Sequence, residues 1–258
     1  MYRLERFAEL TEPCGLVHGF STREDGNLGF RYGPKGQVIN LRSSFTRRVH
    51  PSFLPRRGVG MVPQRPGFEE DIVSVEPELH GCGMHAPDSG PPCEAMIAAE
   101  GFLFVATGDC PAIVVADCRT GFVALIHASR ESTIREISRK TVERMVSRLG
   151  TRPADLVIGM GPGIRRDSYV LQTFAPADQA GSPWQRFVQK TDEGVSVDLF
   201  GYNRHLFEAL GVPPGRIIEC PFDTFTDQRF ASHRRSKANG EPEWRHGCAF
   251  GIVPSERA

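Results

Sequence analysis

The segment from Phe102 to Thr133 combines three apolar runs with one tight turn, and it constrains the fold more than any other stretch. The runs cover residues 103–106, 112–117 and 122–128, and their β-branched content is typical of buried strands. The last two are separated by Cys118 to Gly121, where the glycine can take the positive φ that a hairpin turn requires. The sequence therefore predicts a β-hairpin between residues 112 and 128, with a helix starting soon after it.

The register of this hairpin places two reactive side chains together. A four-residue turn pairs Asp117 with Phe122 and puts His127 opposite Ala112. Cys110 points to the same side as Ala112, because strand side chains alternate with a period of two. Cys110 and His127 are then diagonal neighbours on adjacent strands, with roughly 7–8 Å between their backbones. Both can bind one metal ion, or contact each other, beside a helix start whose N–H groups favour anions.

Composition limits the classes of protein to consider. The 258 residues are 40% hydrophobic, which is enough for a substantial core, and no linker divides them, so we expect one domain over 1–258. Basic and acidic residues number 31 each, and this balance argues against nucleic acid or a membrane surface as a partner. Seven scattered cysteines without a CxxC pair, and an N-terminus without an apolar signal segment, favour a cytoplasmic protein with reduced thiols.

The remaining elements follow from hydrophobic periodicity and helix-end signals. Apolar positions three and four apart predict helices, and short apolar runs predict strands. Asp198 is a good N-cap for the third of the helices. The expected helices are 37–49, 132–149, 199–210 and a further one at 183–190, and the expected strands include 72–75, 95–98, 156–159, 217–218 and 248–253. Residues 229–235 are expected to form a loop.

A metal site is one interpretation of the Cys110–His127 pair. His80 follows a predicted strand and is the best third ligand, and one Cys with two His leaves a fourth zinc position open for catalysis. Cys82 and His85 are alternative ligands in the same loop. Against this, most scattered cysteines and histidines are buried thiols and surface imidazoles. Another alternative is that Cys110 and His127 act as nucleophile and base without a metal.

Asp109 precedes the thiol directly, and it is expected either to support the site or to cap its loop.

Two blocks then resemble a known family. TGDCPAIVVAD at 107–117 with ALIHA at 124–128 resembles the paired signature of the laccase-domain family, also called multicopper polyphenol oxidases. Members of that family are similar to purine nucleoside phosphorylases that act through zinc. Other blocks follow in the family's order: HGFSTREDG at 18–26, Asn27-Leu-Gly29, Glu78-Leu-His80-Gly81, Gly161-Pro-Gly-Ile164 with Tyr169, Val197-Asp-Leu199 with Asn203 and Leu206, and residues 230–235.

The resemblance implies a fold, a metal site and a reaction. The implied fold is α+β, with layered sheets packed between helices in an α/β/β/α arrangement. The implied metal is zinc, rather than copper, on His80, Cys110 and His127. The implied reaction is phosphorolysis of adenosine, inosine or methylthioadenosine, with adenosine deamination as a second activity.

The substrates would therefore be a small nucleoside and phosphate. We expect Arg23, together with Arg130 or Arg234, to clamp the phosphate, because guanidinium groups match its geometry. Asn27, in the loop after Arg23, is expected to contribute to the same binding site. Cys110 and His127, with Arg23, would be the catalytic residues. The sequence does not indicate an oligomeric state.

The sequence also departs from the family pattern beside the implied site. Residues 128–132 read Ala-Ser-Arg-Glu-Ser where the family has Ala-Gly-Trp-Arg-Gly, so Glu131 stands in place of an arginine. Similar departures are Glu78 for glutamine, Asp223 for cysteine and Val170 for an acidic residue. These changes leave open a protein that binds a metal or nucleoside without turnover. Copper-dependent polyphenol oxidation is a further alternative, although it needs more closely grouped histidines than this chain has.

Overall fold

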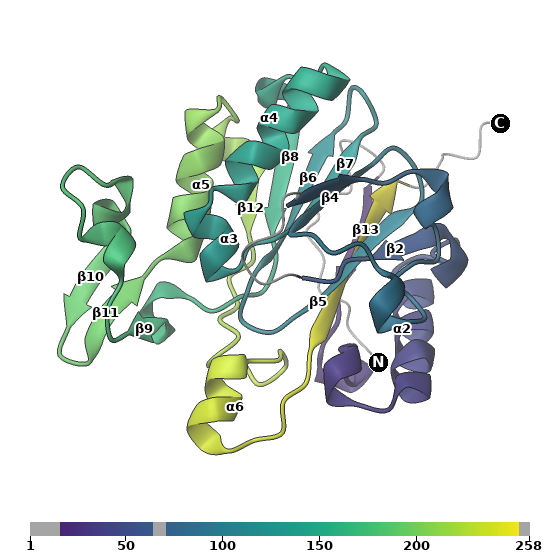
Figure 1. Ribbon diagram of the computed structural model, residues 1–258, viewed down its shortest axis with the longest axis horizontal. Coiled ribbons are helices and arrows are strands. Elements are labelled where there is room, and N and C mark those ends of the chain that lie inside the picture. Colours follow the sequence, from purple (N-terminus) through teal and green to yellow (C-terminus); the bar gives the residue numbers. More distant parts are fainter. Residues whose placement is uncertain (1–15, 64–70, 253–258) are drawn as a thin grey trace.

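Two β-sheets stacked face to face form the centre of the structure, a computed structural model that describes residues 16–63 and 71–252 (Figure 1). The larger sheet has the order β12-β8-β6-β7-β4-β3, and the smaller has the order β1-β13-β5-β2. The larger sheet consists of β3 (Ile72–Ser74), β4 (Ala95–Ala98), β6 (Ala112–Asp117), β7 (Val123–His127), β8 (Leu156–Met160) and β12 (Ile217–Glu219). The smaller sheet consists of β1 (Leu16–Phe20), β2 (Gly58–Gly60), β5 (Phe102–Thr107) and β13 (His246–Ile252).

The hairpin at the centre of the larger sheet has the predicted register. His127 pairs with Ala112, and the amide of Asp117 donates to the carbonyl of Phe122 over 2.9 Å. Gly121 closes the turn with a φ of 79°, a conformation that is costly for residues with a Cβ. The local chemistry of the turn therefore fixes which side chains face each other along β6 and β7.

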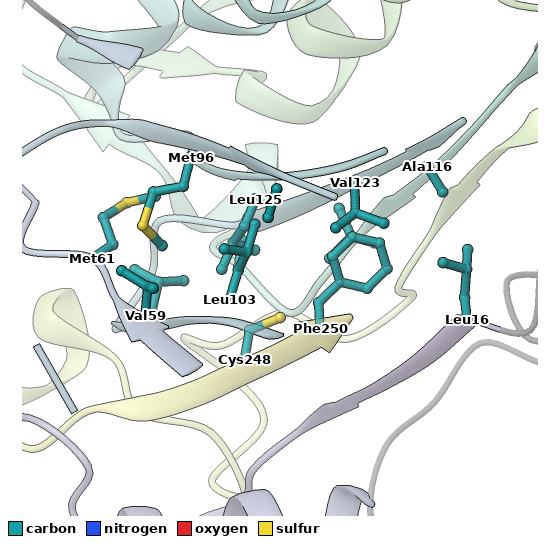
Figure 2. Close-up of a cluster of buried hydrophobic side chains, with 14 of the residues drawn as sticks. Leu16, Val59, Met61, Met96, Leu103, Ala116, Val123, Leu125, Cys248 and Phe250 are labelled. Atoms are coloured by element: carbon teal, nitrogen blue, oxygen red, sulfur yellow. The ribbon is translucent and has the colours of Figure 1, made fainter. Parts of the chain in front are cut away.

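A first hydrophobic layer lies between the two sheets. Figure 2 shows Leu103 and Phe250 of the smaller sheet directed towards Met96, Val123 and Leu125 of the larger one. These side chains are all buried, as the alternation of inward and outward positions along the strands requires. Burial of this layer fixes the stacking of the sheets.

Helices cover the outer face of each sheet. Helix α2 (Lys35–Val49) packs Phe45 against Phe104 of β5. Helices α4 (Ile137–Leu149) and α5 (Leu199–Ala209) cover the larger sheet, where Met145 and Phe207 join its outward-facing side chains. The four layers confirm the predicted α+β fold of α/β/β/α type.

The predicted helix over 132–149 is wrong in its boundaries, because the chain forms two helices there. The first, α3 (Arg130–Ile134), begins at Ser129, whose hydroxyl accepts the amide of Ser132 over 3.1 Å. The break falls at Glu136, which is left-handed with a φ of 58°. Its carboxylate binds Arg139 at 2.7 Å and accepts the Tyr202 hydroxyl at 3.0 Å, and these contacts hold the kink.

Two further expectations are wrong. Residues 183–190 are not a helix: a 3-10 turn is followed by β10 (Val188–Thr191), which forms a small third sheet with β11 (Gly194–Val197) and β9 (Val170–Leu171). Residues 229–235 are not all loop, because α6 (His233–Asn239) begins within them. The remaining short 3-10 helices are Arg23–Asp25, Phe30–Tyr32, Pro55–Arg57, Pro77–Leu79, Pro87–Ser89, Pro153–Asp155, Arg166–Ser168, Ala175–Ala177, Pro183–Arg186 and Pro214–Arg216.

Two observations concern the cellular setting. Cys118 is disulfide-bonded, so the expectation of reduced thiols throughout does not hold at this position. Within the described ranges, none of the helices has the length and apolar character needed to cross a membrane.

Candidate active site

A cavity with a volume of about 890 Å³ opens where the end of β5 meets the base of the β6–β7 hairpin. Cys110 follows β5 and His127 ends β7, and both line this cavity. Other parts of the wall come from segments far apart in the sequence, including Tyr32, Arg130 and Arg245. The hairpin thus brings the thiol and the imidazole together at a cavity large enough for a small organic ligand.

Glu94 completes an arrangement with His127 that the sequence did not indicate. Its Oε2 lies 2.6 Å from Nδ1 of His127, and the carboxylate side chain is only 1% exposed. Glu94 directly precedes β4, and its carbonyl also accepts the His127 amide over 2.8 Å. Because the carboxylate occupies Nδ1, Nε2 is the ring nitrogen left for a partner in the cavity, which Cys110 also lines.

The charges around His127 determine its protonation. Burial alone would lower the pKa of the imidazole, but the Cys110 thiolate, by its charge and its hydrogen bond, and the Glu94 carboxylate raise it to about 10. The structure therefore favours an imidazolium at neutral pH, held by the Glu94 carboxylate.

The prediction that His80 completes a metal site is wrong. A Cβ on Gly101 would lie 3.3 Å from Nε2 of His80, so this imidazole lies at the beginning of β5, whereas Cys110 follows its end. The six residues of β5 span roughly 20 Å. Cys82 and His85 do not line the cavity either.

In the described part of the chain, no third ligand is grouped with Cys110 and His127. Strand β2 continues into Met61, Val62 and Pro63, which line the cavity and offer no nitrogen, oxygen or thiolate ligand from their side chains. Over residues 16–63 and 71–252, no three His, Cys, Asp or Glu residues are grouped as metal ligands. The residues present therefore do not fit the three-ligand zinc site that the resemblance implies.

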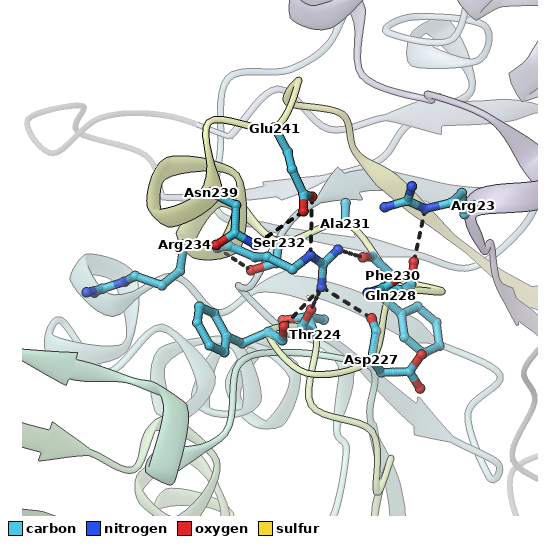
Figure 3. Close-up of polar contacts among 12 residues, drawn as sticks. Arg23, Thr224, Asp227, Gln228, Phe230, Ala231, Ser232, Arg234, Asn239 and Glu241 are labelled. Carbon is cyan, nitrogen blue, oxygen red and sulfur yellow. Dashed lines mark hydrogen bonds and ion pairs between the residues drawn. The ribbon is translucent and has the colours of Figure 1, made fainter.

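The four residues predicted to bind phosphate divide into two pairs. Arg130 and Arg234 line the cavity. Arg23 does not line it. The Nε of Arg23 donates to the Gln228 carbonyl over 3.1 Å, and Figure 3 shows Arg23 and Arg234 on opposite sides of the group of residues drawn. Asn27 is also outside the cavity wall. Its Oδ1 accepts the amide of Arg245 over 3.0 Å, so it supports the loop that carries this arginine.

The cavity is strongly basic although the chain has no net charge. Six of its lining residues are cationic and two are carboxylates, Asp109 and Glu131. The cationic residues are Arg31, Arg42, Arg130, Arg234, Lys237 and Arg245. Arg130 and Arg234 were predicted from the sequence, whereas the other four follow no motif, which is why sequence reasoning missed them. Such a wall attracts anionic ligands.

Arg235 anchors the segment that presents Arg234. Its guanidinium donates to the carbonyls of Thr224 and Phe230, the latter over 2.7 Å, and pairs with Glu241 (Figure 3). The Arg234 side chain leaves this cluster, donates to the Val170 carbonyl over 2.9 Å and stacks on Tyr169 with its Cζ 5.2 Å from the ring centre.

Tyr169 supplies a hydroxyl near the thiol. Burial raises the pKa of this phenol, while the positive charges of Arg130 and Arg234 act in the opposite direction. The hydroxyl thus keeps its proton at neutral pH and can donate a hydrogen bond inside the cavity.

Asp109 fixes the corner between β5 and Cys110. It has a φ of 80°, a left-handed conformation that Asp tolerates better than most side chains. Its carboxylate accepts the Thr224 hydroxyl over 2.8 Å and the Arg234 amide over 2.7 Å. This residue therefore joins the thiol segment to the segment that carries the cavity arginine.

His246 leads to a prediction on pH. Its Nδ1 accepts the Ala231 amide over 3.3 Å, and Nε2 lies 3.2 Å from the Thr107 hydroxyl. Burial first, and then Arg245, lower its pKa to about 3. The unfolded chain, with a pKa near 6.5, binds the proton that the folded chain excludes, so this residue makes stability fall as the pH drops from about 6.5 to about 3.

We expect a His246→Gln variant to lose roughly 2–3 kcal/mol less stability than the parent between pH 7 and pH 4.5. Urea unfolding at the two pH values measures this difference. Equal losses in the two proteins would contradict it.

This chain is similar in sequence to one family model and to several known proteins. The family model described as "Multi-copper polyphenol oxidoreductase laccase" matches residues 64–242. A "Purine nucleoside phosphorylase" of Deinococcus radiodurans is 30% identical over 201 residues, which is 76% of each chain. Another of that name, from Bacteroides thetaiotaomicron, is 30% identical over 144 residues, 54% of this chain and only 53% of the relative.

Solved structures share the fold. The hypothetical protein YfiH of Bacillus licheniformis superposes with a TM-score of 0.82 at 22% identity, and YlmD of Geobacillus stearothermophilus with a TM-score of 0.83 at 24% identity. Each match covers 93% of both chains.

Proposed function

We propose, from the premise that this chain belongs to the multicopper polyphenol oxidoreductase laccase family, that it cleaves purine nucleosides with orthophosphate. The observation that carries the proposal is the basic, aromatic-lined cavity around Cys110 and His127. The names of the relatives support the same reaction class. The nucleoside and orthophosphate are the two substrates that we propose.

Arg130 and Arg234 would bind the phosphate. Both line the cavity that Cys110 lines, and the guanidinium of Arg234 lies over the Tyr169 ring. Guanidinium groups can bind phosphate through two parallel hydrogen bonds. Glu131 reduces this positive field, since its carboxylate lies 3.6 Å from the Arg130 guanidinium.

Aromatic side chains and His127 would act on the nucleoside. Tyr169, Phe30 and Tyr32 line the cavity and offer surfaces on which a purine can stack. In the reaction, a phosphate oxygen forms a bond to the anomeric carbon while the bond from that carbon to the purine nitrogen breaks. The departing base takes a proton, and we assign its donation to the imidazolium of His127, which lines the cavity.

This proposal includes no metal step. Zinc would need a third ligand beside Cys110 and His127, and multiple copper ions would need several grouped histidines, which the described part of the chain does not provide. A relative named "Adenosine deaminase RL5" is 32% identical over 45% of this chain. Deamination needs a water molecule activated for attack. The lining residues of the cavity do not favour that reaction over phosphorolysis. Deamination, oxidation of phenols and binding without turnover are therefore alternatives that the assay separates.

The test is release of free base from adenosine or inosine, followed by chromatography with and without orthophosphate. We expect release that depends on phosphate. Replacement of Arg234 by alanine should raise the KM for phosphate about 10- to 100-fold, because a charge-assisted contact is worth about 1.5–3 kcal/mol.

Arg23→Ala is the matched control and should leave that KM unchanged, because Arg23 lies outside the cavity. Formation of inosine from adenosine without phosphate would favour deamination instead. Ligand-induced thermal stabilisation without any product would indicate a binding protein.

A further inference from the structure

We propose that Cys110, His127 and Glu94 form a metal-independent nucleophilic triad that hydrolyses activated acyl esters or thioesters bearing an anionic group. This activity goes beyond nucleoside phosphorolysis, since it needs no orthophosphate. It assigns a chemical role to Glu94, and a nucleophilic one to Cys110.

The carboxylate and the imidazole have the geometry of a triad. Glu94 Oε2 is 2.6 Å from His127 Nδ1, and the backbones of the same two residues are joined by a hydrogen bond of 2.8 Å. The double connection fixes the ring orientation, and the pairing of His127 with Ala112 brings Cys110, two residues before Ala112, to the same side. A buried acidic residue in this position orients the imidazole and stabilises its protonated form.

Cys110 is set apart from four other cysteines of the chain. Cys93, Cys220 and Cys248 are buried, and Cys82 is half-buried but does not line the cavity. Cys110 is half-buried and lines the cavity together with His127. It thus has the three properties of a catalytic thiol: access to ligand, a base in the same cavity and space to hold the substrate.

The segment after β2 adds apolar surface to the cavity. It reaches the cavity with Met61, Val62 and Pro63, whose side chains donate no hydrogen bond. This surface can contact the acyl chain of a substrate.

The chemical steps balance with water as the only co-reactant. The Cys110 sulfur forms a bond to the carbonyl carbon, and the bond from that carbon to the ester oxygen or thioester sulfur breaks. The leaving alcohol or thiol takes the proton of His127. A water molecule then gives one proton to His127 as its oxygen attacks the acyl carbon, and the carbon–sulfur bond breaks to release a carboxylic acid and regenerate the thiolate.

The surrounding charges define the substrate class. Negative charge develops on the carbonyl oxygen during each attack, and the Tyr169 hydroxyl and the Arg234 guanidinium, which line the same cavity as the thiol, can stabilise it. Further cations, such as Lys237 and Arg245, line the same cavity. A substrate with a carboxylate or phosphate group remote from the acyl carbon is complementary to this distribution.

The experiment compares 4-acetoxybenzoate, which is anionic, with its neutral methyl ester in a buffer without orthophosphate. We expect release of 4-hydroxybenzoate with turnover and an acetyl group on Cys110, detected by intact-mass and peptide mass spectrometry. The anionic probe should react about 10-fold faster in kcat/KM, as one charge-assisted contact provides. This preference runs against the better leaving group of the methyl ester.

Variants separate the three roles. Cys110→Ala and Cys110→Ser should each lower turnover by about 10³-fold or more, and Cys82→Ala should leave it unchanged. Glu94→Gln should lower kcat by about 10²-fold and alter its pH profile, whereas Glu94→Asp should restore part of the rate. Circular dichroism confirms that each variant is folded.

The last measurement is the dependence of ester turnover on metal ions. Turnover that persists after treatment with EDTA supports the triad. Loss with EDTA and recovery with zinc overturns it, as does acetylation that persists in Cys110→Ala, or the absence of both turnover and acetylation in a folded parent protein. Because the assay contains no orthophosphate or nucleoside, its failure is separate from failure of the phosphorolysis proposal.

Discussion

Replacing Asp109 by alanine is expected to lower kcat/KM for any reaction at Cys110 by about 10²-fold, since a displacement of about 1 Å in a catalytic group has an effect of that size. The substitution removes the acceptor of the Thr224 hydroxyl and the Arg234 amide, and it places alanine at a φ of 80°. The expected loss of folding stability is roughly 2–4 kcal/mol. Nucleoside or ester turnover and urea unfolding measure the two effects.

Asp109→Asn is the matched variant. Asparagine tolerates the left-handed conformation and can still accept the Arg234 amide, while its NH₂ group can donate to the Thr224 hydroxyl. It should therefore retain most of the stability and lose less activity than the alanine variant. If Asp109→Ala kept full activity, Asp109 would not be the residue that positions the thiol.

Replacing Gly83 by alanine is expected to cost roughly 3–5 kcal/mol of folding stability. Gly83 has a φ of 69°, and a Cβ there would lie 1.9 Å from the carbonyl oxygen of Gly60 and 2.9 Å from the Cα of Gly90. Both neighbours are backbone atoms, so no side-chain rotation can relieve the clash. Its own carbonyl accepts the guanidinium of Arg42 over 2.6 Å, so a shift would also disturb a buried charge.

Gly150→Ala separates the two causes. Gly150 has a φ of 66°, close to that of Gly83, but a Cβ there would meet no atom within 4 Å. This control should cost only about 1 kcal/mol, the strain of the left-handed conformation. Urea unfolding of both variants gives the comparison, and equal losses would show that the contact with Gly60 contributes nothing.

The part of the site that the sequence predicted is the part determined by local chemistry. The turn at Gly121 fixes the pairing of His127 with Ala112, and the side-chain period of a strand then brings Cys110 to the same side. Helix α5 was predictable for the same reason, because Asp198 caps it at one end. These features depend on residues within a few positions of one another.

Glu94 was missed because its place depends on pairing between distant strands. It faces His127 only because β4 lies next to β7 with Ala95 opposite Ile126. Nothing in the run of residues around Glu94 indicates that partner. The available signal in the sequence was an acidic residue directly before an apolar run, and this signal is weak.

His80 was misplaced because a short block was given a position by likeness alone. Glu78-Leu-His80-Gly81 lies at the wrong end of β5 for the cavity, and the segment that reaches the cavity from β2 holds Met61 to Pro63. Helix α6 was missed for a different reason. Its sequence, HRRSKAN, has no apolar face for periodicity to detect, and its ends are set by Ser232 and Gly240.

The pairing of the chain's first and last described strands has a consequence for biosynthesis. Strand β13 lies between β1 and β5, so Leu16 pairs with Ile252, and Phe102 with Gly251. The larger sheet uses strands between residues 72 and 219 and can assemble while the ribosome is still adding residues. The smaller sheet must wait for β13, and Arg245, which immediately precedes it, arrives at the same time. The cavity therefore closes only after residues 245–252 have been synthesised, and a chain that stops before them carries the thiol without the walls that would give it a substrate.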